Sequence, residues 1–118
     1  MVERFFTPKE ANQILPIVKK IVEEILSKAN EPAMPDHHIK TLMAQLEDMG
    51  CYYKDWSSYR TLTVVRNFEI GLVDFPAIIH GQHALLCWRS DEPEVAWYHG
   101  YEDGYAGRRQ VTRELIFS

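Results

Sequence analysis

The sequence predicts an α+β fold, in which an N-terminal helical hairpin packs on one face of an antiparallel three- to four-stranded β-meander. Two observations support this prediction. Apolar residues recur at helical spacing over about residues 7–50, and from residue 71 onward they alternate with a period of two. A chain of 118 residues has room for a single domain, in which residues 51–70 form a variable middle.

The first helix is predicted to begin after Thr7. Thr7 is a favoured N-cap residue, Pro8 needs no backbone N–H at the first helical position, and Glu10 can reach back to the cap. The stripe of apolar positions that follows contains Ala11, Ile14, Leu15, Val18, Ile21, Val22, Ile25 and Leu26. This spacing indicates an amphipathic helix that ends near residues 29–30, with Pro16 bending its first turns.

A second helix is predicted after the proline-containing break at residues 31–35. Asp36 is suited to cap it and Gly50 to stop it. One face carries the apolar residues Ile39, Leu42, Met43, Leu46 and Met49. Two amphipathic helices joined by a short link favour an antiparallel hairpin.

Strands are predicted for the second half of the chain. The aromatic stretch at residues 51–70 is compatible with a strand or with a helix, and the sequence leaves both open. Residues 72–79 and 82–89 flank His80-Gly81, a pair typical of a two-residue hairpin turn. A turn at residues 90–93 predicts a third strand at 94–99, and residues 111–117 could form a fourth strand or a docking tail.

The predicted turns fix which side chains meet across the strands. The first hairpin places Asp74 opposite Cys87 and Ala77 opposite Ala84, and the second places Ala84 opposite His99. His99 would then lie beside two small alanines, on the sheet face covered by the helices. We expect a cleft there, next to the glycine-rich loop at residues 100–110.

The candidate ligand-binding residues of this cleft are His99, Asp103, Arg108, Arg109 and Tyr101. His99 with Asp103 could hold a metal ion or form a base with its orienting carboxylate, and a histidine that only closes the core is the structural alternative. Arg108 and Arg109 could grip a small anion or simply carry surface charge.

The remaining polar residues have structural explanations. Asp74 and Arg89 are secondary candidates, most simply explained as a cross-strand surface ion pair. The pairs His37-His38 and His80/His83 have no metal-site spacing. Cys87 lies beside a carboxylate, which discourages ionisation, so it is not expected to be a nucleophile. Trp88 and Trp97 are expected to anchor the core.

Composition limits the partners. The formal net charge of −4 argues against nucleic acid as the main partner, although Arg108, Arg109 and Arg113 leave that as a third hypothesis. No apolar run has a membrane-spanning length, and the N-terminus has no apolar signal core, so we expect no membrane partner. Two widely separated cysteines, Cys51 and Cys87, favour free thiols in a reducing cytoplasm, with a disulfide between them as the alternative.

Several motifs resemble one uncharacterised prokaryotic family, known as domain of unknown function 2203. They are residues 6–12, the Leu15-Pro16 step, and residues 71–77, 86–89, 97–99 and 104–109. The resemblance implies a compact cytoplasmic domain and no particular activity.

For function, the sequence predicts a small binding or interaction module that forms a homo-oligomer, because the first helix carries an apolar stripe wide enough for two partners. The alternative is a domain that binds a metal or a small ligand, or a minor enzyme, with its site at His99, Asp103 and Arg108. No catalytic triad or nucleotide motif is recognisable, and no particular cofactor is indicated.

Overall fold

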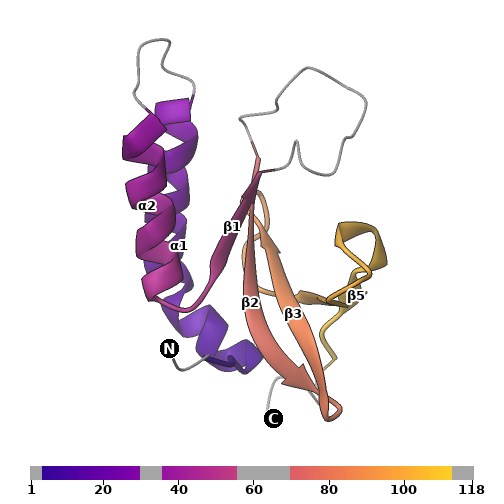
Figure 1. Cartoon of the computed structure of the whole chain (residues 1–118). Coiled ribbons are helices and arrows are strands. Elements are labelled where there is room, and N and C mark those ends of the chain that lie inside the picture. Colours follow the sequence, from indigo (N-terminus) through magenta and orange to yellow (C-terminus); the bar gives the residue numbers. More distant parts are fainter. Residues whose placement is uncertain (1–3, 30–35, 56–69, 113–118) are drawn as a thin grey trace.

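The structure is a computed structural model that describes residues 4–29, 36–55 and 70–112 (Figure 1). Within these residues, two helices, α1 (Pro8–Ala29) and α2 (Asp36–Asp48), precede a five-stranded antiparallel sheet with strand order β1-β2-β3-β4-β5. The sheet contains β1 (Tyr52–Asp55), β2 (Gly71–Ile79), β3 (Gln82–Arg89), β4 (Trp97–Gly100) and β5 (Arg109–Gln110), with the 3-10 turn η2 (Tyr105–Gly107) before β5. This arrangement confirms the predicted α+β fold.

Helix α1 begins with the predicted capping box. The backbone N–H of Thr7 donates to Glu10 Oε1 at 3.0 Å, and the N–H of Glu10 donates to Thr7 Oγ1 at 3.1 Å. Pro16 lies inside the helix, and Figure 1 shows α1 changing direction between its first turns and the longer part beside α2. The predicted stripe faces inward, with these residues buried: Ala11, Leu15, Val18, Ile21, Val22 and Ile25.

Helix α2 lies beside α1 as the second arm of the predicted hairpin (Figure 1). Leu42 and Leu46 of its apolar face are buried, and Ile39 and Met43 pack against the same core. The chain leaves the helix through Gly50, whose φ of +96° is a conformation that favours glycine. The predicted break at residues 31–35 lies outside the described residues.

The pairing of β2 with β3 follows the predicted register. Asp74 pairs with Cys87 and Ala77 with Ala84. His80 and Gly81 form the tight turn, and both have positive φ values, +52° and +74°, as a type I′ turn requires. Of the segment whose structure the sequence left open, residues 52–55 form the edge strand β1, and residues 56–69 are not among those described.

The predicted register of the next pair is wrong by one residue. Ala84 pairs with Gly100 and Leu85 with His99. The strand β4 also begins at Trp97 instead of residue 94. The physical reason is a contact with α1. The Asn12 side chain accepts from Val95 N at 2.8 Å and donates to Val95 O at 3.1 Å, which holds Val95 as part of a longer connection. A shift of one residue moves every later side chain to the opposite face.

The last strand also differs from the prediction. The strand β5 occupies residues 109–110, where Arg109 pairs with Tyr98 and Gln110 with Trp97. Val111 continues the contact by donating its N–H to Ala96 O at 2.8 Å. Residues 111–117 were expected to form a fourth strand or a docking tail, and 113–117 lie beyond the described part of the chain.

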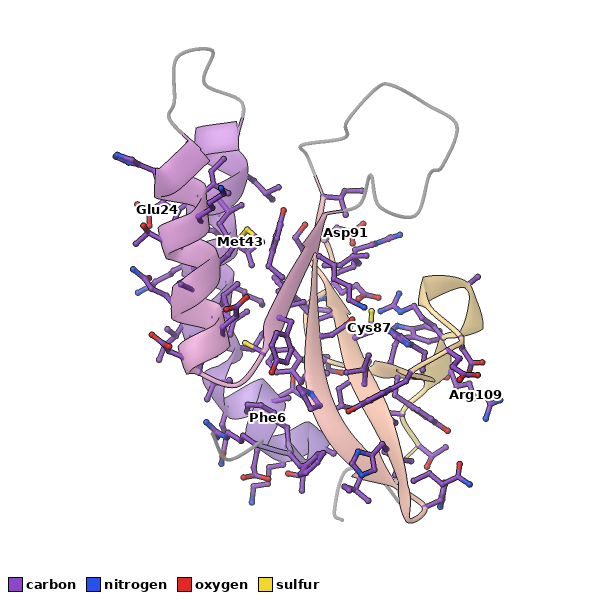
Figure 2. All side chains as sticks on the ribbon, viewed as in Figure 1. Phe6, Glu24, Met43, Cys87, Asp91 and Arg109 are labelled. Atoms are coloured by element: carbon purple, nitrogen blue, oxygen red, sulfur yellow. The ribbon has the colours of Figure 1, made fainter. Side chains whose placement is uncertain are left out.

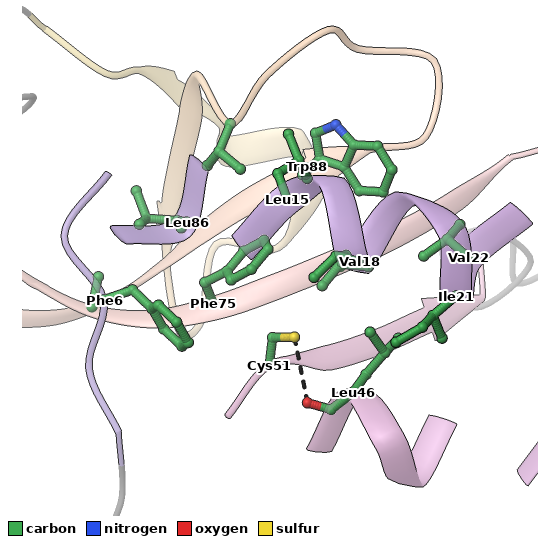
Figure 3. Packing of buried hydrophobic residues seen from close by; sticks show 14 of the residues in the cluster. Phe6, Leu15, Val18, Ile21, Val22, Leu46, Cys51, Phe75, Leu86 and Trp88 are labelled. Atoms are coloured by element: carbon green, nitrogen blue, oxygen red, sulfur yellow. Dashed lines mark hydrogen bonds between the residues drawn. The ribbon is translucent and has the colours of Figure 1, made fainter. Parts of the chain in front are cut away.

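The hydrophobic core lies between the helices and one face of the sheet (Figure 3). From the sheet it receives Val73, Phe75, Leu86 and Trp88, all at most 1% exposed. Phe6 packs edge-on against Phe75, with ring centroids 5.4 Å apart. The helices therefore cover one face, and the opposite face carries the polar side chains described next. Within the described residues, no helix combines the length and apolar character needed to cross a membrane.

Candidate metal centre

Three potential metal ligands meet on the sheet face that points away from the helices. Asp74 on β2 is paired with Cys87 on β3, and the observed register of β4 brings His99 to the same face. One ligand atom from each residue lies within 4.8 Å of the others, and the three side chains are all buried. Figure 2 shows Cys87 on the side of the sheet opposite α1 and α2.

The ring of His99 is oriented by its own strand. Its Nδ1 lies 2.8 Å from the carbonyl oxygen of Gly100. Since a carbonyl oxygen only accepts, Nδ1 carries a hydrogen, and Nε2 is the atom turned toward Asp74. Nε2 lies 3.5 Å from Asp74 Oδ1. This position can be occupied by a proton, which makes an imidazolium, or by a metal ion.

Asp74 is a buried carboxylate with two cationic neighbours. Its Oδ2 lies 2.8 Å from Lys54 Nζ, and its Oδ1 faces His99. Even so, neither of its oxygens, nor His99 Nε2, forms a hydrogen bond of regular geometry with any described residue. Buried polar atoms without hydrogen bonds are costly, and they often mark a ligand site.

The predicted surface ion pair between Asp74 and Arg89 is therefore wrong. Asp74 is 1% exposed, and its charge partners are Lys54 and His99. Arg89 points elsewhere and contacts the Asp91 carboxylate at 2.5 and 2.8 Å. The prediction placed the two residues on the correct face but did not include Lys54, because β1 was not recognised as a neighbouring strand.

The two charged side chains favour each other's ionised forms. Burial alone would raise the pKa of Asp74, but the contacts and charges of His99 and Lys54 outweigh it and lower that pKa. Burial alone would lower the pKa of His99, whereas Asp74 and the Gly100 carbonyl raise it, and the net pKa is raised. The aspartate–imidazolium pair is thus the favoured state when no metal is bound.

The thiol of Cys87 stays protonated in this environment. Burial, followed by the nearby charge of Asp74, raises its pKa to about 12, although Arg108 acts in the opposite direction. The sequence predicted this resistance to ionisation. Cys87 is also fully buried, so it has neither the thiolate character nor the access of a catalytic nucleophile. A bound cation would supply the missing stabilisation of the thiolate.

The other residues of the predicted cleft lie apart from this cluster. Asp103 is exposed and accepts a hydrogen bond from Gly100 N at 3.3 Å, so the carboxylate beside His99 is Asp74 instead. Tyr101 is 51% exposed, with its ring 6.0 Å from that of His83. Arg109 is exposed on β5 (Figure 2). That these residues bind a ligand stays a prediction.

Arg108 is the member of the predicted set that comes nearest to the cluster. Its guanidinium lies 2.6 Å from Glu92 Oε1 and donates to the Cys87 carbonyl oxygen at 3.1 Å. It also lies over the Trp97 ring, 5.1 Å from the centroid. Arg108 therefore supports the strand behind Cys87, and these contacts differ from the anion-binding role that the sequence suggested.

Two hollows lined by described residues lie away from the cluster. One of about 680 Å³ is bounded by α1, residues 93–96 and the start of the C-terminal segment, and a second of about 410 Å³ adjoins it around Pro93. His99 lines neither of them. Because His99 lies on the face opposite Ala77 and Ala84, the predicted cleft beside these alanines is wrong.

Sequence reasoning identified His99 but missed the ligands around it. Asp74 was already predicted to lie opposite Cys87, which accounts for two of the three residues of the cluster. That His99 joins them was hidden by the register of β4, which depends on the contact between Asn12 and Val95, residues 83 positions apart. No local sequence signal reports such a contact.

Comparison with protein families gives one match. The family described as uncharacterized conserved protein (DUF2203) matches residues 27–111, more than half of the chain. The chain belongs to this family. The suspected resemblance is confirmed. The matched range of the DUF2203 chain includes Lys54, Asp74, Cys87 and His99. Neither the curated proteins nor the solved structures contain a match.

Proposed function

We propose that this DUF2203 chain is a small metal-binding domain, which holds one divalent transition-metal ion with Asp74, Cys87 and His99. The observation that carries the proposal is the cluster itself. Three different ligand atoms lie within 4.8 Å of one another on buried side chains. Two of those side chains present polar atoms that have ionic contacts but no hydrogen bond of regular geometry with any described residue.

The types of ligand indicate the class of metal. A thiolate, an imidazole and a carboxylate together suit Zn²⁺ and its neighbours such as Co²⁺, whereas Mg²⁺ and Ca²⁺ prefer oxygen ligands alone. Histidines that bind metals commonly donate their other ring N–H to a backbone carbonyl, which fixes the ring. The contact between His99 Nδ1 and Gly100 O has this form.

The charge of the cluster also favours the replacement of protons by a metal ion. Without metal, the lowered pKa of Asp74 and the raised pKa of His99 favour a carboxylate beside an imidazolium, and the raised pKa of Cys87 favours a neutral thiol. A divalent ion would replace the second imidazole proton and the thiol proton. The net charge of the three buried groups would therefore not change, and the affinity for metal should fall as pH falls.

A thiolate ligand requires a reduced cysteine. Cys87 is a free thiol in the structure. A reducing compartment would keep it in that form, which is consistent with the cytoplasmic location that we propose from the sequence.

Native mass spectrometry of untagged protein with added Zn²⁺ tests the proposal. We expect one zinc ion per chain, together with a rise in the melting temperature, because an ion that binds only the folded state stabilises it. Cys87→Ser and His99→Gln should lose both effects. Cys51→Ser is the matched control, since Cys51 is a buried thiol that donates to Leu46 O on the helix side of the sheet. Equal zinc binding by wild type and Cys87→Ser would refute the proposal.

A homo-oligomeric interaction module is the second candidate. The apolar stripe of α1 packs against the chain's own core, so the surface for such contacts has to lie elsewhere. Ile78 and Tyr101, 48% and 51% exposed, lie on either side of His83 at the turn end of the other sheet face. Light scattering after size exclusion should show a dimer that Ile78→Ser weakens. A strict monomer at high concentration would remove this candidate.

A further inference from the structure

Lys54 is the solvent-exposed neighbour of the buried cluster. Its side chain is 40% exposed, while that of Asp74 is 1% exposed. Lys54 is paired with Leu72 across β1 and β2, two positions from the Tyr52–Asp74 pair, and its ammonium reaches diagonally to Asp74. Beside the three buried side chains of the cluster, Lys54 is thus the residue that an ion from solvent meets before it reaches the carboxylate.

The contact between Lys54 and Asp74 is an attraction between charges without the geometry of a regular hydrogen bond. Nζ lies 2.8 Å from Oδ2, yet that oxygen has no hydrogen bond of regular geometry. The ammonium sits at the end of a flexible stem, and the side chain is 40% exposed, so it already borders water. Asp74, in contrast, is fixed within the central strand pair of the sheet.

We propose that the Lys54 ammonium pairs with the Asp74 carboxylate in the metal-free chain, and that this ion pair breaks when a metal ion binds to Asp74. The inference rests on the proposed metal site. Two cations compete for one carboxylate, and a carboxylate that coordinates a divalent ion has little negative charge left to hold an ammonium. Lys54 then moves toward solvent, and the ion binds the Asp74 carboxylate beside Cys87 and His99.

In the opposite role, Lys54 would stay beside Oδ2 after the metal ion binds and would help to hold the coordinating carboxylate in position. The two roles predict opposite effects of removing the charge. A competitor, when removed, leaves a site that binds metal more tightly and more quickly. A supporting partner, when removed, leaves a site that binds metal more weakly.

Titration with Co²⁺ of the full chain distinguishes them, because cobalt bound to a thiolate gives a near-ultraviolet charge-transfer band. The variants are Lys54→Gln, Lys54→Met as a second uncharged side chain, and Lys54→Arg, which keeps the charge. The control is Lys40→Gln, which removes an exposed lysine of α2, on the other side of the sheet (Figure 1). Stopped-flow mixing gives the rate of uptake, and melting in EDTA gives the stability of the metal-free state.

We expect Lys54→Gln and Lys54→Met to bind Co²⁺ about tenfold more tightly, and to load faster, than wild type. Both should melt at a lower temperature in EDTA, since Asp74 has lost a counter-charge. Lys54→Arg and Lys40→Gln should resemble wild type. Unchanged or weaker binding by the uncharged variants, with a charge-transfer band that Cys87→Ser abolishes, would overturn the role of Lys54 and leave the metal site standing. Absence of that band in wild type and in every variant would refute the metal site itself.

Discussion

The Nε2 atom of His99 lies 3.5 Å from the Oδ1 atom of Asp74, and both side chains are 1% exposed. Such a pair is stable when both groups are ionised or when a cation lies between them. A neutral imidazole would turn a lone pair toward the carboxylate, because Nδ1 already carries the hydrogen donated to Gly100. The stability of the metal-free protein should therefore depend on the ionisation of both groups.

The first prediction concerns the pH dependence of stability in EDTA. Because the pKa of His99 is raised in the folded state, its contribution is complete below the unfolded value of 6.5 and is lost as pH rises through the folded value. Because the pKa of Asp74 is lowered, its contribution is present above the unfolded value of 3.8 and is lost as pH falls through the folded value. The free energy of unfolding, measured with urea, should therefore be highest between pH 3.8 and pH 6.5.

In His99→Gln, the free energy of unfolding should no longer fall as pH rises above 6.5. His80→Asn is the control, since His80 is exposed in the β2–β3 turn at a positive φ that asparagine tolerates. A wild-type profile that does not fall above pH 6.5 would contradict the proposed ionisation of His99.

The second prediction compares two aspartates. Asp74→Asn should destabilise the metal-free protein by about 1–3 kcal/mol, because the charge that Lys54 and His99 contact is removed inside the protein. Asp91→Asn removes a 48% exposed carboxylate paired with Arg89 and should cost less than about 1 kcal/mol. Urea unfolding at pH 5.5 measures both. Equal effects of the two substitutions would show that the Asp74 contacts contribute no more than a surface pair.

The third prediction concerns the thiols. Cys51 and Cys87 are buried, and the pKa of each is raised to about 12. Neither should react with an aromatic disulfide reagent at pH 8 in the native state, and both should react in denaturant. Mass spectrometry of labelled peptides locates the modification. Rapid native labelling of Cys87 would mean that the cluster opens to solvent far more than its burial indicates.

The fourth prediction concerns the clamp that sets the β4 register. Asn12→Ala removes two hydrogen bonds to Val95 and one to Pro8, and should cost about 1–3 kcal/mol. The Val95 amide should also lose protection from hydrogen exchange. Gln13→Ala changes the exposed neighbour on the same helix and should have little effect. Retained protection of Val95 in Asn12→Ala would show that other contacts hold this connection.

The parts of the fold that depend on local chemistry could be predicted from the sequence. The capping box at Thr7 and Glu10, the stripe of α1 and the His80-Gly81 turn all involve residues close in sequence, and their register follows from side-chain period and turn type. The connection from Arg89 to Trp97 depends instead on long-range contacts to Asn12 and on the bond from Trp88 Nε1 to Glu92 O. An error of one residue there moved His99 to the wrong face, and with it the predicted site.

The ligand set is the central claim, and X-ray absorption at the zinc edge tests it most directly. The zinc-loaded protein should show one sulfur neighbour at about 2.3 Å and nitrogen or oxygen neighbours at about 2.0–2.2 Å, and Cys87→Ser should lose the sulfur. A shell of nitrogen and oxygen alone in the wild-type protein would show that zinc binds elsewhere, and would contradict the assignment of Asp74, Cys87 and His99.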